Sequence, residues 1–326
     1  MTAAMLLAQT GDRGISISAD SVIGLLSFTI AFATLLYLAS LGELISERAG
    51  VLNLGVEGMM AMGAVTAFIV GIEWENPWLA LLAGIIVGAL TGGIHALMSV
   101  VLGADQVVSG LALTIFGLGL SAFVGKDYVG QPPGATLKGI DIPGLSDIPW
   151  VGEILFQQSP IVYLTVLVGI GAWFVLNRTR MGLGLRAAGE SAATADATGH
   201  SVVRIRVGAV MTGGALAGAS GAYLSLTLAN SFFESVTAGW GWIAVALVIF
   251  GAWNPGRLAL GALLFGFTIA LEPRLQTFGV DLSPVLLSML PYLLTVAAMI
   301  AISIRSRHRP SPAPAALGRP YRREER

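Results

Sequence analysis

Charged residues interrupt the apolar sequence between Gly42 and Gly58, which reads GELISERAGVLNLGVEG. Non-helical backbone at membrane depth is tolerated only beside protein or water, and broken helices of this kind line substrate paths in transporters. Asn53 is placed to cap or line such a break. Glu57 falls in the first turn of the next helix, where the helix dipole favours an anion. The alternative is an ordinary cytoplasmic turn in which Glu47 and Arg48 are solvated.

A second polar segment, from Arg178 to Arg206, is basic at both ends and alanine-rich between them. Helix propensity favours a short helix over Glu190–Thr198, and Gly199 is typical of the residue that ends a helix. A simple connection does not need such a helix, whereas a short exposed helix can dock in a groove on a soluble partner. We therefore predict a small, non-spanning docking helix here.

The sequence does not assemble an enzyme's catalytic residues. Gly218–Gly221 matches the GxSG signature of rhomboid intramembrane proteases, but the serine needs a base, and the only later histidine is His308 in the polar tail. With no cysteine and three scattered histidines, we expect no catalytic residue, no metal site and no cofactor. The sequence also lacks GxxxxGK[ST], so an ATPase that drives this protein is expected to be another polypeptide.

The composition predicts the elements that position these segments. Of 326 residues, 55% are hydrophobic and 11% charged, and the net charge is −1. Soluble domains carry about 25% charged residues, so a soluble enzyme is excluded, and no basic patch suggests a nucleic-acid partner. We predict an all-α, polytopic transmembrane bundle of about eight to ten helices, some broken or half-length. The predicted spans are Val22–Leu41, Glu57–Ile72, Leu79–Leu102, Val107–Val124, Pro160–Leu176, Ile205–Leu228, Gly241–Trp253, Leu258–Leu271 and Pro284–Ile304.

The basic residues predict the orientation of the spans. If Arg178–Arg206 is cytoplasmic, all but four of the 18 basic residues fall inside, the exceptions being Arg13, Lys126, Lys138 and Arg274. The N-terminus is then outside and the C-terminus inside. The other cytoplasmic segments are Glu43–Val56, Gly103–Gln106, Asn254–Arg257 and the tail.

Three regions follow from this topology. We predict an external segment over residues 1–21, a membrane domain over 22–304, and a disordered basic tail over 305–326 that contacts lipid headgroups. The external loop Gly125–Ser159 is either a tether or a cover for an outer opening.

Small residues recur at four-residue spacing in Gly84, Gly88 and Gly92, and again in Gly214 and Gly218. Such stripes let membrane helices approach closely, so we predict helix packing through them.

A few polar and aromatic residues accompany the spans. His95 lies within a span, where it either bonds across helices or lines a solute path. Asn230 follows a span on the outer side, where it meets arriving solute or faces water. The tryptophans near span ends fit an interfacial aromatic belt, namely Trp240, Trp242 and Trp253.

Two segments resemble a known family. Arg186-Ala-Ala-Gly-Glu190, followed by small residues and Gly199, looks like the coupling segment of ABC importer permeases. Residues 41–60, LGELISERAGVLNLGVEGMM, resemble the N-terminal block of the nucleoside and simple-sugar permeases, which are related to the branched-chain amino acid permeases. The resemblance covers roughly Val22–Ile304. One departure is that Gly199 is followed by His-Ser-Val and not by the Ile-x-Leu-Pro of the older binding-protein-dependent signature.

The resemblance implies a permease subunit of an ATP-driven ABC importer in the cell (inner or plasma) membrane. The implied solute is a nucleoside, and a simple sugar or a branched-chain amino acid is the alternative. An ion-coupled secondary transporter is a different class, which the scarcity of mid-span carboxylates disfavours. The residues expected to line the substrate path are Asn53, Glu57, His95 and Asn230.

The resemblance also implies partners. The coupling segment, about residues 186–199, would contact a cytoplasmic ATP-binding subunit that uses ATP and Mg²⁺. A second permease subunit, identical or paralogous, and an external solute-binding lipoprotein complete the expected assembly. The expected docking residues are Arg186, Glu190, Ala193, Asp196 and Gly199.

Overall fold

A computed structural model describes residues 19–277, 283, 286–287, 289–306 and 312–321. The predicted external segment therefore lies almost wholly outside the described residues. The part of the chain that the structure describes is helical and contains no β-strand. The α-helices are α2 (Ala19–Arg48), α3 (Val56–Trp74), α4 (Pro77–Ala96), α5 (Gln106–Gly125), α6 (Pro160–Arg178), α7 (Arg180–Glu190), α8 (Ala192–Ala197), α9 (Val202–Tyr223), α10 (Trp240–Phe250), α11 (Pro255–Thr277) and α13 (Leu290–Ser306).

Single turns of other helix types extend or connect these helices. The π-helical turns are η1 (Leu97–Val101), η3 (Gly152–Phe156) and η4 (Leu224–Leu228), and η2 (Lys126–Tyr128) is a 3₁₀ turn. Seven helices within the described residues are long and apolar enough to cross a membrane. The helix α10 is apolar but has only 11 residues, as expected for a half-length span. The predicted all-α, polytopic bundle is confirmed.

The first helix is longer than we predicted. The expected span ended at Leu41, but α2 continues to Arg48. Three of the polar residues that suggested an end, Glu43, Ser46 and Glu47, are buried in the bundle, and each forms a hydrogen bond there, so they do not break the helix. Ser40 donates to the carbonyl of Leu36 at 2.5 Å, and Ser46 to that of Gly42 at 3.2 Å.

The two glycine stripes pack α4 directly against α9, as predicted. A Cβ atom added at Gly88 would overlap the carbonyl oxygen of Gly214 and the Cα of Gly218. One added at Gly92 would lie 2.8 Å from the carbonyl of Val210. The backbones of these helices are therefore close enough to exclude side chains between them.

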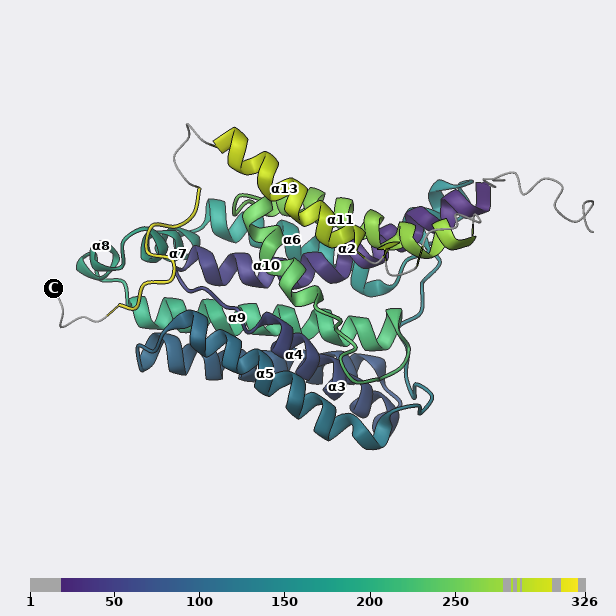
Figure 1. Ribbon diagram of the computed structural model, residues 1–326, viewed down its shortest axis with the longest axis horizontal. Helices are drawn as coiled ribbons and strands as arrows, with labels where there is room; N and C mark the ends of the chain where they lie inside the picture. The colour runs from purple at the N-terminus through teal and green to yellow at the C-terminus, as the bar shows by residue number, and fades with distance from the viewer. Residues whose placement is uncertain (1–18, 278–282, 284–285, 288, 307–311, 322–326) are drawn as a thin grey trace, which may run out of the picture.

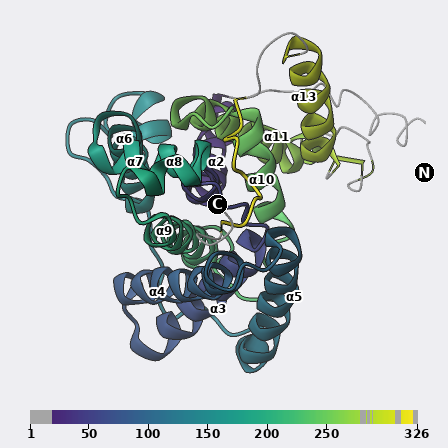
Figure 2. The same cartoon turned by 90° about the vertical axis from the view of Figure 1, so that its left-hand side faces the viewer.

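The segments predicted on the cytoplasmic face lie together at one end of the bundle. Figure 1 shows this end at the left, with α7, α8 and the C-terminal segment, and Figure 2 looks onto it. Leu52, after α2, donates to the side chain of Gln106 at 2.7 Å. Arg48 donates to the carbonyl of Trp253 at 2.8 Å, next to the α10–α11 turn.

The loop predicted to be external lies at the opposite end and is hydrogen-bonded to α2 and η4. Leu137 donates to the carbonyl of Leu226 in η4 at 3.1 Å, and Ser27 of α2 donates to that of Glu153 at 3.2 Å. Because it is fixed to both α2 and η4, this loop is more than a tether.

The described part of the tail, Pro312–Tyr321, packs against the end of the bundle that contains α7 and α8 (the predicted coupling end), although the sequence predicts a disordered tail. Ala316 donates to the carbonyl of Gly189 at 2.8 Å, and Pro314 is buried. Ala313 and Leu317 pack beside the core cluster of α2 and α10. The tail residues that lie between the charged positions are small and apolar, so they can bury apolar surface against the bundle.

Candidate functional site

The break between α2 and α3 is buried and is held by side chains from three helices. The carboxylate of Glu43 accepts a hydrogen bond from the amide of Asn53 at 3.0 Å. His95 Nε2 lies 3.1 Å from the carbonyl of Leu52. These bonds satisfy non-helical backbone groups that would otherwise be unpaired inside the bundle. The alternative of a solvated cytoplasmic turn is therefore wrong.

Three more contacts support this break. The hydroxyl of Thr114 in α5 donates to the carbonyl of Leu54 at 2.7 Å. Asn53 Oδ1 accepts from the amide of Gly55 at 3.1 Å, just before α3 begins. The other ring nitrogen of His95, Nδ1, lies 2.8 Å from the hydroxyl of Ser109. Asn53 and His95 thus meet at the same break, where both hold backbone or bond across helices.

Glu57 lies in the first turn of α3, as predicted, but its carboxylate serves a different helix. It accepts hydrogen bonds from the Thr237 hydroxyl at 2.5 Å, the Gly239 amide at 2.9 Å and the Gly241 amide at 2.6 Å. The N-cap position of α10, Gly239, has no side chain to cap the helix. Glu57 therefore provides the N-terminal cap of α10 from another part of the chain.

Glu47 joins the end of α2 to the end of α10. Its side chain is 1% exposed and accepts a 2.5 Å hydrogen bond from Trp253 Nε1. Trp253 is buried, so its predicted place in an interfacial belt is wrong, because its indole nitrogen has a partner inside the protein. Sequence reasoning missed this role for Glu47, although Ser40, Glu43 and Glu47 share the spacing of one helix face.

The predicted short helix exists, with different boundaries, and its docking role stays a prediction. The helix α8 begins after Ser191, whose side chain accepts from the amide of Thr194 at 3.3 Å. Ser191 has an extended backbone (φ −152°), so it separates α8 from α7. Glu190 is consequently the last residue of α7 and not the first turn of the short helix.

Gly199 ends the short helix, as predicted. Its φ of +88° is a left-handed conformation that glycine adopts without a Cβ penalty. The amides of Gly199 and His200 then bond back to the carbonyls of Asp196, at 3.0 Å, and Ala195, at 3.1 Å. These bonds satisfy carbonyls at the helix end and turn the chain toward α9.

One face of α8 is buried, and within the described residues Ala193, Thr194 and Ala197 on the other face are exposed. Ala192 and Ala195 pack with Ala188 and Val202. Figure 1 shows α8 as the leftmost of the labelled helices. Of the predicted docking residues, Glu190, Ala193 and Gly199 are exposed, and Arg186 and Asp196 are half-buried.

Arg206 ties three segments of the coupling end together. The residue is 2% exposed, and its guanidinium donates to the carbonyls of Ala49 at 3.1 Å, Arg319 at 3.0 Å and Ala188 at 3.5 Å. Those carbonyls belong to the turn after α2, the tail and α7. In the sequence analysis, Arg206 is placed only in the basic flank. Its position one residue inside an apolar run nevertheless indicates that its side chain is buried.

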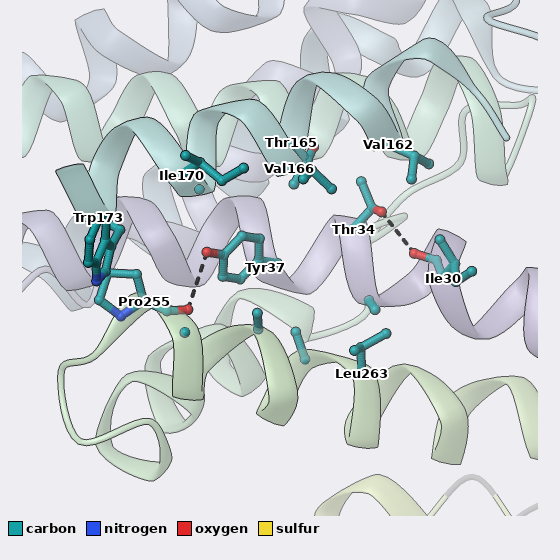
Figure 3. A pocket seen from close by; sticks show the side chains of 15 residues that line it. Ile30, Thr34, Tyr37, Val162, Thr165, Val166, Ile170, Trp173, Pro255 and Leu263 are labelled. Atoms are coloured by element: carbon teal, nitrogen blue, oxygen red, sulfur yellow. Dashed lines mark hydrogen bonds between the residues drawn. The ribbon is translucent and has the colours of Figure 1, made fainter. Parts of the chain in front are cut away.

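Two cavities follow α2 and α6 from mid-bundle to the coupling end. The first has a volume of about 390 Å³ and lies between α2, α6 and α11 (Figure 3). Its walls are apolar except at hydroxyls such as that of Tyr37, which donates to the carbonyl of Pro255 at 3.2 Å. The second, of about 570 Å³, lies beside Ile45 of α2 and Leu185 of α7.

The seven long apolar helices, the buried break and the short exposed helix α8 define a polytopic α-helical membrane protein. Over residues 25–299 the sequence matches the family described as "Branched-chain amino acid transport system / permease component". The chain belongs to this family, which makes it the membrane-spanning permease subunit of an ABC importer. The alternative of an ion-coupled secondary transporter is therefore wrong.

Proteins related to this chain carry names from two solute classes. It is 41% identical to the putative glucose ABC transporter permease protein TsgC13 of Haloferax volcanii, over 92% of this chain and 98% of the relative. It is 36% identical to the guanosine ABC transporter permease protein NupQ of Bacillus subtilis, over 90% and 94%. It is 35% identical to the nucleoside ABC transporter permease protein NupC of Lactococcus lactis, over 83% and 89%. No solved structure matches the chain.

Proposed function

We propose that this permease carries a nucleoside across the cell membrane in an ATP-driven importer. The observation that carries the proposal is the similarity, over most of both chains, to permeases named for guanosine and nucleosides. Because this sequence has no P-loop, a separate subunit that uses ATP and Mg²⁺ hydrolyses the ATP that drives transport. This chain binds no cofactor and performs no catalysis in the proposal.

The docking site for that ATPase is the free face of α8. A short helix with small exposed residues fits a groove on a soluble partner. The surface is formed by Ala193 and Gly199 with the carboxylate of Glu190 beside them, and Arg186 and Asp196 lie at its edge. The coupling end is then cytoplasmic, the C-terminus lies inside and the N-terminus outside.

Movement at α8 reaches the membrane helices through rigid contacts. The helix α8 packs on α9, and Arg206 joins α7 to the turn after α2. Three of the predicted path residues support the backbone close to these contacts. Asn53 and His95 hold the break between α2 and α3, and Glu57 caps α10. We propose that they position the path more than they contact solute, because their polar groups already have partners.

The assembly contains a second permease subunit, an external solute-binding lipoprotein and surrounding lipid. A paralogous partner is supported by a further relative, the guanosine permease protein NupP of Bacillus subtilis, which is 24% identical to this chain. The same organism thus has two related permeases named for one solute.

A simple sugar is the second candidate solute, because the putative glucose permease TsgC13 is 41% identical to this chain. Solute specificity is tested by purifying the cognate binding protein and measuring its affinity for guanosine and glucose by titration calorimetry. Tight binding of guanosine supports the nucleoside proposal, and binding of glucose alone contradicts it.

A further inference from the structure

A third cavity lies at the outer end of the bundle, and its walls differ from those of the other two. It has a volume of about 680 Å³ and lies between the outer half of α2, the external loop and the η4 turn. Ligand sites for small molecules commonly have volumes of roughly 300–1,000 Å³. Many of the residues that line it are polar, whereas the two deeper cavities are lined mainly by apolar side chains.

Two hydroxyls at the wall of this cavity are buried without a partner. Tyr223 is 0% exposed and Ser159 is 5% exposed, and within the described residues neither Tyr223 Oη nor Ser159 Oγ has a hydrogen-bond partner. Both residues line the cavity. Buried polar groups are nearly always satisfied by protein, water or ligand. Each of these oxygens has almost no accessible surface, so a small side-chain movement would open it to a polar occupant of the cavity.

The charges in the wall nearly balance. The charged residues that line the cavity are Asp20, Glu153 and Lys138. A cavity that carries both signs in this way offers no strong field for an anion or a cation. It suits a neutral solute that forms several hydrogen bonds.

The cavity also offers aromatic and apolar surface for a flat ring. Phe28 of α2 lines it and is 51% exposed, and the Arg274 guanidinium lies 5.7 Å from the centroid of its ring. Leu228 in η4 adds apolar surface. Aromatic faces stack with planar bases, and a simple sugar has no planar ring to use this surface in the same way.

The backbone around the cavity is unusual at three points. Two π-helical turns border it, η4 through Thr227 and η3 through Glu153. Asn230 lines it from a left-handed backbone conformation with φ of +46°. Single π-helical turns and left-handed non-glycine residues cost free energy and occur preferentially at functional sites.

We propose that this cavity is an outer binding site for a nucleoside, which it holds before passage along α2. The base stacks on Phe28, and the ribose hydroxyls pair with Tyr223 Oη and Ser159 Oγ. Both cavities border α2, where Ala31 lines the outer cavity and Ile30 lines the mid-bundle one. This inference rests on the proposed nucleoside transport.

The absence of cysteine in the chain gives a direct test. Gln157 is exposed and lines the cavity, and Gln131 is exposed in the same loop but does not line it. Gln157→Cys and Gln131→Cys are each introduced into the permease of the assembled transporter in proteoliposomes. The rate of modification by a membrane-impermeant thiosulfonate is then measured with and without guanosine or glucose.

Guanosine at ten times its dissociation constant should slow modification at Gln157→Cys about tenfold and leave Gln131→Cys unchanged. In the Gln157→Cys background, Tyr223→Phe should raise the guanosine concentration for half-protection about tenfold, because one hydrogen bond is lost. Tyr37→Phe removes a hydroxyl that lies outside this cavity and should not change that concentration.

Equal modification rates with and without guanosine, in a transporter that imports guanosine, would overturn the outer site while leaving the proposed function intact. Unchanged half-protection in the Tyr223→Phe variant would overturn the assigned hydroxyl contact. Protection by glucose alone, together with glucose uptake, would show that the proposed nucleoside function itself is wrong.

Discussion

The carboxylate of Glu57 accepts a 2.6 Å hydrogen bond from the amide of Gly241, a residue 184 positions later in the chain. This bond places the charge of one buried glutamate at the N-terminus of the short helix α10. The helix has only 11 residues, so its end lies inside the bundle, where water cannot satisfy its amides. The break before α3 and the half-length α10 therefore depend on each other.

Glu57→Gln should lower the stability of the permease. The amide side chain keeps the shape of the carboxylate but loses its charge and brings N–H donors toward the Gly239 and Gly241 amides. The expected cost is about 1–3 kcal/mol, measured as a lower unfolding temperature in detergent. Glu234→Gln is the control, because Glu234 is exposed. Equal unfolding temperatures for the two variants would contradict the assigned cap.

Arg206→Lys should release the tail from the coupling end. A lysine ammonium cannot reproduce the fork that reaches the carbonyls of Ala49, Ala188 and Arg319. We expect the amide of Ala316 to exchange its hydrogen about tenfold faster, corresponding to about 1.4 kcal/mol of lost protection. Arg204→Lys is the matched control because Arg204 is exposed. Unchanged exchange at Ala316 would contradict this role for Arg206.

Ala193→Arg should weaken binding of the ATP-binding subunit without unfolding the permease. Ala193 is exposed on α8, so a long charged side chain would obstruct a groove without disturbing the core. We expect loss of co-purification with the ATPase by at least about tenfold, equivalent to about 1.4 kcal/mol. Gln131→Arg at the opposite end should leave co-purification intact. Retention of the ATPase by the Ala193→Arg variant would show that α8 is not the docking surface.

Single cysteines at Thr194 and Gln131 should be modified from opposite sides of the membrane. Thr194 lies on α8 at the coupling end, and Gln131 lies in the external loop. An impermeant maleimide added to intact cells should label only Gln131→Cys, and both variants should label after the cells are opened. Labelling of Thr194→Cys in intact cells would reverse the proposed orientation.

The sequence predicted the spans and the segments that share one end, because both depend on local composition. Apolar runs set the helices, and charged residues set the ends of the bundle. The end of α2 could not be predicted this way. Glu47 remains in that helix because Trp253, more than 200 positions later, provides its partner.

The short helix near Gly199 was predicted with its position right and its first residue wrong. Gly199 requires a left-handed backbone that local rules identify. The split at Ser191 depends on a cap that competes with continued helix, and helix propensity alone does not resolve that competition. The ordered tail was missed because its contacts, such as Ala316 with Gly189, join distant parts of the chain.

The central claim, that this permease imports nucleosides by ATP hydrolysis, is tested most directly by transport. The permease, its partner subunits and the cognate binding protein are reconstituted in proteoliposomes, and uptake of radiolabelled guanosine is measured with and without ATP. We predict guanosine uptake that requires ATP, is competed by other nucleosides and is not competed by glucose. Uptake of glucose alone, or guanosine uptake that persists without ATP on an ion gradient, would contradict the claim.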